Sequence, residues 1–211
     1  MHEARKGKLV SIDDDFNGAV NQAAQIFNEG GVFVYPTDTI YGIGGDPFNV
    51  NTVARINSIK GRDESKRFIL LIDNLERLLS YVNVVLDKHF DFLHSIWPNP
   101  VSVILNLNHD SAKHLGSKTA AFRIPHHRFS RSLISEIKKP IISTSANRSG
   151  QEPLLERDFI NYELGPELDC IFYSEKKSHK VASTLVDLTG NQPVLIREGI
   201  VKFEDLMASY E

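Results

Sequence analysis

The amino-acid sequence predicts an α/β protein in which helices flank a twisted, mixed β-sheet. Short apolar runs rich in β-branched and aromatic residues recur along the chain, which is the composition of buried strands. These runs outnumber what a simple alternation of strand and helix would supply, so a mixed sheet fits better than a purely parallel one. Between them, apolar residues repeat with a period near 3.6, as on the buried face of a helix.

The first half of the chain is predicted to open with a strand at residues 8–12. Asp14 is the expected N-cap of the next helix, which carries Phe16 and Val20 on its apolar face. The same reasoning predicts strands over 32–35 and 68–72, and helices over 49–59, directly after Asn74, and over 84–97.

The second half is predicted to contain more strands than helices. The expected strands cover residues 101–107, 119–124, 140–144, 171–173, 183–188 and 194–197. The expected helices cover residues 130–137, 154–163 and 203–209. Gly190-Asn191 favours a hairpin between the last two strands. We expect residues 1–211 to form one domain, because a chain of this length can bury a single large core.

Composition argues against several classes of protein. A hydrophobic content of 41% and a charged content of 24% are typical of globular proteins. A net charge of -3 argues against binding of nucleic acid through the overall charge of the protein. Cys170 is the single cysteine, so no disulfide forms within the chain. The charged N-terminal residues do not fit a signal peptide, and no apolar run approaches the roughly 18–20 residues that span a bilayer. We therefore expect a cytoplasmic enzyme or binding domain that makes no membrane contact.

A polar, glycine-rich stretch follows the predicted strand at 32–35. Thr37 and Thr39 come directly after the strand, and three glycines lie within residues 42–45. Such a turn would let a ligand approach backbone N–H groups closely. Asp38 could pair with a cation, hold Mg²⁺ through water, or stabilise the turn.

A cluster of four cationic residues follows soon after this stretch. Lys60, Arg62, Lys66 and Arg67 follow a predicted helix; cations there commonly complement the helix dipole, but four of them beside a glycine-rich turn favour phosphate binding.

Arg123 and Arg197 each end an apolar strand. A buried guanidinium needs an anion, either a structural carboxylate or a ligand, and convergence of both on one cavity would favour the ligand. The small hydroxyl residues of 143–150 could serve the same anion, although a plain surface loop has a similar composition.

The common nucleotide and metal motifs are absent from the sequence. Pro47 stands where the third glycine of GxGxxG belongs, and no GxxxxGK[ST] loop occurs. The eight histidines show no HExxH or CxxC context, so we expect no metal held by the protein alone.

Six segments of the sequence form a set of motifs: residues 35–44, 60–62, 97–105, 121–125, 145–150 and 183–187. Taken together, these segments resemble the YrdC/YciO family, and within it the single-domain threonylcarbamoyl-AMP synthases. The match spans roughly residues 15–200, and the segments occur in the family's order and spacing.

The resemblance implies a YrdC-like α/β domain whose twisted mixed sheet surrounds a deep, positively charged cavity. It implies an L-threonylcarbamoyladenylate synthase, a nucleotidyltransferase that joins L-threonine, bicarbonate and Mg²⁺-carrying ATP and releases pyrophosphate. A separate tRNA threonylcarbamoyl transferase complex would then use the product to modify the adenosine beside the anticodon. Contact with tRNA or double-stranded RNA is a further expectation.

The resemblance also implies roles for individual residues. Lys60 and Arg62 would be the catalytic cations on the ATP phosphates. The remaining nucleotide-binding residues would be Lys66, Thr119, Ser145, Asn147 and Arg197. The threonine-binding residues would be Thr37, Thr39, Arg123, Ser143 and Ser183, with Arg123 on the threonine carboxylate.

The sequence departs from the synthase pattern after Arg62. Where a typical synthase continues toward an Asn-Pro-Leu stretch and a histidine, this chain has Lys66-Arg67-Phe68, which is more like the YciO branch. The alternative function is therefore that of a diverged YciO-like homologue, which binds nucleotide or RNA without the synthase activity.

Overall fold

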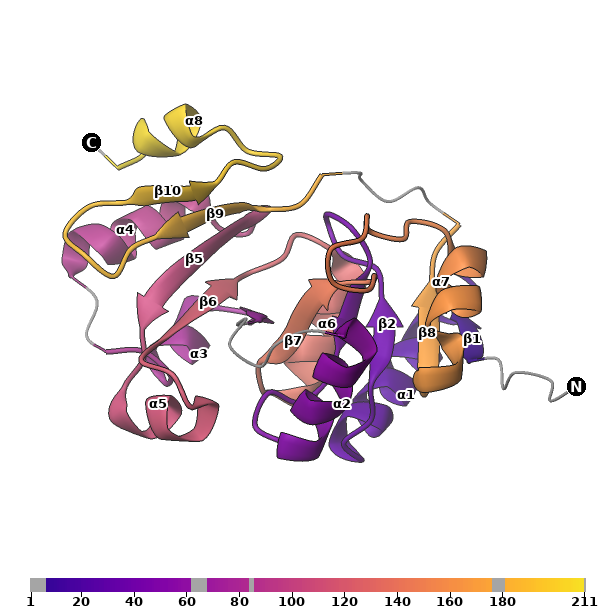
Figure 1. Ribbon diagram of the computed structural model, residues 1–211. Coiled ribbons are helices and arrows are strands. Elements are labelled where there is room, and N and C mark those ends of the chain that lie inside the picture. Colours follow the sequence, from indigo (N-terminus) through magenta and orange to yellow (C-terminus); the bar gives the residue numbers. More distant parts are fainter. Residues whose placement is uncertain (1–6, 62–67, 84–85, 176–180, 211) are drawn as a thin grey trace, which may run out of the picture.

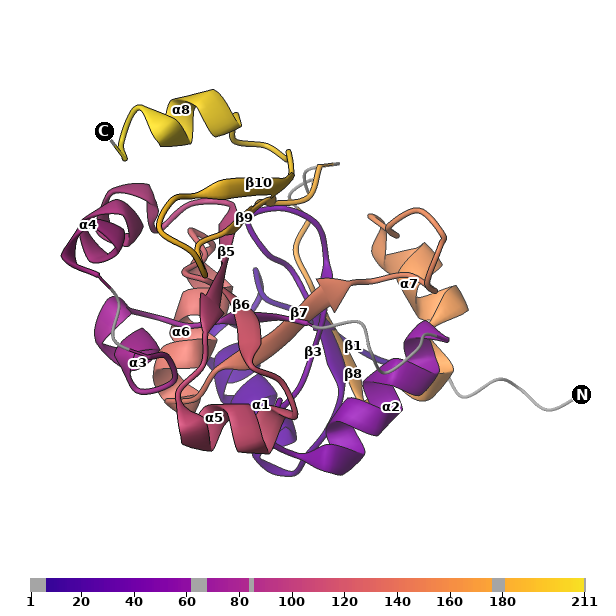
Figure 2. The ribbon, with the colours of Figure 1, turned by 60° about the vertical axis from the view of Figure 1, so that its left-hand side comes forward.

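A computed structural model of the chain describes residues 7–61, 68–83, 86–175 and 181–210. These residues form a mixed α/β fold with a ten-stranded sheet flanked by helices, which confirms the predicted fold class (Figure 1). The strands lie in the order β1-β8-β2-β3-β7-β4-β6-β5-β9-β10. Helices α4 and α8 lie near the β10 end of the sheet, whereas α7 lies near the β1 end (Figure 2).

The strands are β1 (Lys8–Ser11), β2 (Phe33–Tyr35), β3 (Gly42–Gly44), β4 (Ile69–Leu71), β5 (Val101–Asn106), β6 (Thr119–Arg123), β7 (Ile141–Ser145), β8 (Cys170–Tyr173), β9 (Thr184–Asp187) and β10 (Val194–Arg197). The helices are α1 (Phe16–Asn28), α2 (Val50–Lys60), α3 (Leu75–Leu79), α4 (Asp87–Ile96), α5 (His109–Leu115), α6 (Arg128–Ile137), α7 (Arg157–Glu163), the 3₁₀ helix η1 (Gly165–Glu167) and α8 (Phe203–Met207). No helix in the described part of the chain combines the length and the apolar character needed to cross a membrane.

Strand β7 joins the two halves of the sheet. Its C-terminal residues Thr144 and Ser145 pair with β3, whereas residues 141–143 pair with β4. The pairs β2-β3, β3-β7 and β7-β4 are antiparallel, and the parallel pairs β8-β2 and β4-β6 flank them. The hydroxyl residues Thr144 and Ser145 therefore lie at the end of β7 that pairs with β3.

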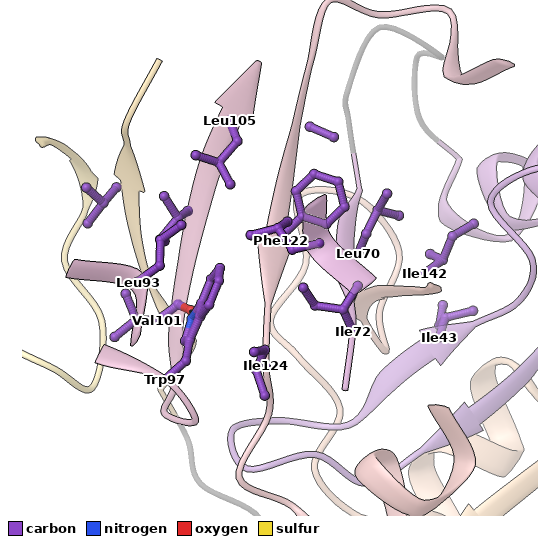
Figure 3. Close-up of a cluster of buried hydrophobic side chains, with 14 of the residues drawn as sticks. Ile43, Leu70, Ile72, Leu93, Trp97, Val101, Leu105, Phe122, Ile124 and Ile142 are labelled. Atoms are coloured by element: carbon purple, nitrogen blue, oxygen red, sulfur yellow. The ribbon is translucent and has the colours of Figure 1, made fainter. Parts of the chain in front are cut away.

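Hydrophobic clusters cover both faces of the sheet. Helices α1 and α6 pack on one face, over a cluster that includes Leu71 and Ile141. On the other face Phe122, Leu70 and Ile142 stand side by side across β6, β4 and β7, in a larger cluster (Figure 3). Side chains alternate along a strand, so Ile69 and Ser143 belong to the same face as α1 and α6.

Most predicted elements are present, with boundaries shifted by a few residues, but two interpretations were wrong and one helix was missed. The N-cap of α1 is Asp15 rather than Asp14, and the Asp15 side chain accepts a hydrogen bond from the Gly18 amide. Residues 42–44, interpreted as part of a turn, form the central strand β3. Helix α5 was not predicted, although Asn108 caps its first turn. The cap at Asn74 and the hairpin between β9 and β10 are confirmed.

Candidate functional site

A cavity of about 680 Å³ lies along the sheet, and its floor follows from the strand register. Ile104, Ala121, Ile69 and Ser143 stand in one row across β5, β6, β4 and β7, and all four line the cavity. Alanine and serine side chains are too small to fill this face of the sheet. The row continues the face that α1 and α6 cover further along the strands, so the cavity occupies the part that those helices leave open.

Charged side chains reach the cavity from three distant segments. Lys60 comes from the end of α2, Arg123 from the end of β6, and Arg197 from the end of β10. Among the described lining residues, Glu152 is the one carboxylate. Both arginines that end apolar strands therefore converge on one cavity, which is the arrangement that favours an anionic ligand over two separate structural ion pairs.

Arg123 is buried, being 2% exposed, and it has both a structural partner and unused donors. Its Nη2 lies 3.4 Å from Asp38 Oδ1, and its Nη1 donates to Thr39 Oγ1 across 3.4 Å. Within the described residues its Nε has no hydrogen-bond partner. Because a guanidinium carries five N–H donors, Arg123 can bind a carboxylate while it keeps Asp38 as a counterion.

Asp38 stands behind Arg123 and is not among the described residues that line the cavity. Its Oδ2 accepts a hydrogen bond from the His126 amide at 3.1 Å. Of the three alternatives for Asp38, the structure therefore shows the ion pair together with a contact that ties the polar turn to the residues after β6.

Lys60 is the last residue of α2, and Gly61 ends the helix in the left-handed conformation. The Lys60 ammonium is buried and donates to Ser145 O at 2.6 Å, to Ser145 Oγ at 3.3 Å and to Asn147 Oδ1. Ser145 Oγ in turn donates to Asn147 Oδ1 at 2.6 Å. These three predicted nucleotide-binding residues therefore form one network at the cavity wall, with the charge of Lys60 at its centre.

Arg197 and Ser183 form the opposite wall. Nη2 of Arg197 donates to Ser183 O at 2.9 Å, and Ser183 Oγ lies 2.9 Å from Ser102 Oγ. Arg197 is exposed as a residue, but its guanidinium is partly shielded from solvent. This partial desolvation lowers the pKa of Arg197, and the neighbouring charge of Arg123 lowers it further. No carboxylate of the described residues forms a salt bridge with Arg197. Two guanidinium groups thus repel each other across a space that an anion would fill.

The remaining predicted residues divide into three groups. Thr39, Thr119 and Ser143 line the cavity. Thr37 does not belong to the described lining; its hydroxyl donates to the Ile40 carbonyl at 2.7 Å and lies 3.0 Å from Thr39 Oγ1, so it stabilises the turn that carries Thr39. Arg62, Lys66 and Arg67 lie outside the described residues.

The interpretation of the glycines at 42–45 as a ligand-binding turn needs correction, because two of them are required by the packing of neighbouring side chains. A Cβ atom on Gly44 would lie 2.6 Å from the Tyr35 ring, and one on Gly45 would lie 2.4 Å from Thr52 Cγ2. Gly42 does line the cavity. Close approach of chain segments, rather than of a ligand, therefore explains Gly44 and Gly45.

Sequence reasoning did not single out Ser102. It lies in the apolar strand β5, where it is fully buried and contacts Ser183. A serine at an inward position of such a strand needs a hydrogen-bond partner, and this signal could have found it. No group of three or more His, Cys, Asp or Glu side chains that could hold a metal ion occurs in residues 7–61, 68–83, 86–175 and 181–210.

Comparison with known proteins relates this geometry to other chains. The family model Sua5_yciO_yrdC, described as "Telomere recombination", matches residues 25–199. The chain is 27% identical to P. abyssi Sua5 complexed with L-threonine, with a TM-score of 0.87; the match covers 96% of this chain and 60% of that chain. It is 26% identical to E. coli YciO, with a TM-score of 0.84, covering 95% and 98% of the two chains. It is also 26% identical to MTH1692 from Methanobacterium thermoautotrophicum, with a TM-score of 0.65 and coverage of 87% for each chain. The chain thus spans about 60% of the length of the Sua5 chains that it matches.

Proposed function

The chain belongs to the Sua5/YciO/YrdC family, and from this premise we propose that it is an L-threonylcarbamoyladenylate synthase. It would join L-threonine, bicarbonate and ATP and release pyrophosphate. The observation that carries the proposal is the convergence of Lys60, Arg123 and Arg197 on one cavity with a single carboxylate in its described lining. The L-threonine complex of P. abyssi Sua5 supports an amino acid as one of the ligands.

The reaction brings anions together, which explains the need for several cations. The threonine amine and bicarbonate form a carbamate and water. A carbamate oxygen then attacks the α-phosphorus of ATP, and the bond between the α-phosphorus and the bridging oxygen breaks to release pyrophosphate. Cations and aligned donors lower the barrier by offsetting the repulsion between carbamate and phosphates. The cavity volume of about 680 Å³ lies within the range of about 300–1,000 Å³ for small-molecule sites.

The threonine site is proposed around Arg123. Its unused N–H groups would bind the substrate carboxylate, because hydrogen bonds from a charged guanidinium to a carboxylate are stronger than those from neutral donors. The Thr39 hydroxyl accepts a hydrogen bond from Arg123, and the Ser143 hydroxyl also belongs to the cavity lining. Thr37 would act through Thr39, and Ser183 would contact the substrate from the opposite wall.

The nucleotide site is proposed between the Lys60 network and Arg197. Lys60, Ser145 and Asn147 would meet the phosphates, and Thr119 and Arg197 would contact the rest of the nucleotide. Arg62 and Lys66 are proposed as further phosphate ligands by resemblance alone. Mg²⁺ carried with ATP would neutralise part of the phosphate charge.

The test is threonine-dependent release of pyrophosphate from ATP and bicarbonate, with identification of the product by mass. We expect release with L-threonine and little with other amino acids. Arg123→Gln should raise KM for threonine, whereas Arg131→Gln should change nothing, because Arg131 is exposed on α6 and does not line the cavity. Absence of threonine-dependent release above background would refute the proposal.

One observation favours the second candidate, a YciO-like protein that binds nucleotide or RNA without this activity. Lys66-Arg67-Phe68 stands where a typical synthase continues toward an Asn-Pro-Leu stretch and a histidine, and in this it is more like the YciO branch. Binding of tRNA or double-stranded RNA that ATP and threonine leave unchanged, together with absent turnover, would support this candidate. With a net charge of -3, the protein would bind RNA through a local patch and show a shallow salt dependence. Under the synthase proposal, by contrast, a tRNA threonylcarbamoyl transferase complex would consume the product.

A further inference from the structure

The guanidinium of Arg148 lies between the C-terminal ends of two helices. Nη1 donates to the Ile59 carbonyl in the last turn of α2, and Nη2 donates to the Glu163 carbonyl at the end of α7, 3.2 Å away. Nη2 also pairs with the Glu167 carboxylate in η1. The last carbonyls of a helix have no partner within the helix, so one side chain here satisfies carbonyls at two helix ends.

The segment 145–150, which contains Arg148, holds Lys60 both at its backbone carbonyl and at its ammonium group. The Ser149 amide donates to the Lys60 carbonyl at 2.7 Å, next to the contact between Arg148 and Ile59. The Lys60 ammonium binds Ser145 and Asn147, which precede Arg148 in the loop. The position of the α2 end relative to this loop therefore determines where the Lys60 charge lies in the cavity.

We propose that Arg148 is a positioning residue for Lys60: by fixing the end of α2 against the loop, α7 and η1, it keeps the Lys60 ammonium at the cavity wall. Arg148 does not line the cavity itself, so it would act through Lys60. Arginine suits this task because its planar fork reaches three acceptors in different directions, whereas a lysine ammonium is a single point charge. The inference rests on the proposed function insofar as Lys60 meets the ATP phosphates.

Arg55 provides a matched control. It belongs to α2, donates to the Glu167 carbonyl through Nε at 3.2 Å and Nη2 at 2.6 Å, and pairs with Asp169 at 2.6 Å. Its side chain is 39% exposed and that of Arg148 is 32% exposed, so the two ion pairs are similarly placed at the surface. Arg55, however, contacts neither the Lys60 backbone nor the loop of 145–150. Its removal should weaken the link between α2 and η1 without moving Lys60.

The experiment compares Arg148→Ala, Arg148→Lys and Arg55→Ala by two measurements. The first is KM for ATP and for threonine. A displacement of about 1 Å in a group that orients a substrate can cost about a hundredfold, so we expect Arg148→Ala to raise KM for ATP at least about tenfold more than Arg55→Ala. KM for threonine should be the same in both variants.

The second measurement is acetylation of Lys60 by acetic anhydride without substrates, followed by mass spectrometry. Buried Lys60 should be protected in the unaltered protein and in Arg55→Ala, and should react faster in Arg148→Ala. Equal protection in the two alanine variants would overturn the inference, as would equal KM values for ATP. If Arg148→Ala does not fold, Arg148→Lys decides, with partial loss of protection expected and full protection contradicting the inference.

The two measurements separate failure of this inference from failure of the proposed function. If the unaltered protein does not turn over threonine, the proposed function is refuted, and the acetylation result alone decides whether Arg148 positions Lys60. If turnover is normal and the Arg148 and Arg55 variants behave alike, the positioning role is refuted and the synthase proposal stands.

Discussion

Replacing Gly44 with alanine should destabilise the protein, because the added methyl group would meet the ring of Tyr35. A Cβ atom on Gly44 would lie 2.6 Å from Tyr35 Cε1, 3.1 Å from Tyr35 Cδ1 and 3.2 Å from Ile141 Cδ1. Tyr35 is fully buried, and its hydroxyl donates to the Ile142 carbonyl at 3.1 Å. The ring therefore has no open space to enter, and a large movement would break its hydrogen bond.

The size of the effect follows from two opposing contributions. Overpacking of a well-filled core costs about 1–3 kcal/mol. Replacing glycine by alanine within a strand returns about 0.5–1 kcal/mol, because alanine loses less conformational freedom on folding. Loss of the Tyr35 hydrogen bond would add about 1–3 kcal/mol if the ring moved. We expect a net loss of about 2 kcal/mol in the free energy of unfolding, which for a chain of this size lowers Tm by about 4–8 °C.

Urea and thermal unfolding, followed through Trp97 fluorescence, would measure this change. Gly190→Ala is the control: apart from Gly190 and its two chain neighbours, no described heavy atom lies within 4 Å of a Cβ atom built there. The stability of this variant should therefore stay within about 0.5 kcal/mol of the unaltered protein. If Gly44→Ala is as stable as Gly190→Ala, the packing argument is refuted. Loss of activity at full stability would instead restore the interpretation that this glycine admits a ligand.

Three other substitutions or titrations test the site and the core. Lys60→Ala should remove most threonine-dependent pyrophosphate release, and near-normal turnover would contradict this. It should also lower the free energy of unfolding by about 1–3 kcal/mol, because the buried oxygens of Ser145 and Asn147 lose their charged donor. Arg197→Gln should raise KM for ATP about ten- to a hundredfold, which is equivalent to the about 1.5–3 kcal/mol of a charged hydrogen bond. Its Tm should change by less than about 2 °C, because the residue is exposed. Burial raises the pKa of the Cys170 thiol to about 12, whereas an unfolded thiol titrates near about 8.5. The native thiol should therefore stay unreactive toward Ellman's reagent at pH 8, and the stability it contributes below about pH 8.5 should fall as the pH rises toward 12; rapid native reaction would refute this.

The strand β3 shows where local patterns mislead. Glycine has a low strand propensity, so residues 42–44 were interpreted as a turn. In the structure glycine is required there because the Tyr35 ring lies over the strand and leaves no room for a side chain at Gly44. A contact between adjacent strands thus overrode the intrinsic preference of the residue.

Arg123 shows the same limit in the candidate site. Its place at the end of an apolar strand predicted that it needs an anion, because burying a lone guanidinium is costly. The sequence allowed Asp38, from the turn after β2, to pair with a cation, but it did not indicate that Arg123 is that cation. The contacts of Arg148 with Ile59 and Glu163 were equally invisible, since they join segments far apart in the chain.

The sequence alone determined the class of fold, most strands and helices and the cap at Asn74, since periodicity, turn residues and capping side chains act over a few neighbouring positions. It also identified the cations and hydroxyls that needed an explanation. Only the tertiary structure decided which of them share a cavity, which are already paired, and which glycines make room for a neighbouring side chain. The physical reason is that these outcomes depend on distances between residues such as Lys60 and Ser145, which lie far apart along the chain and are brought together only when the sheet assembles.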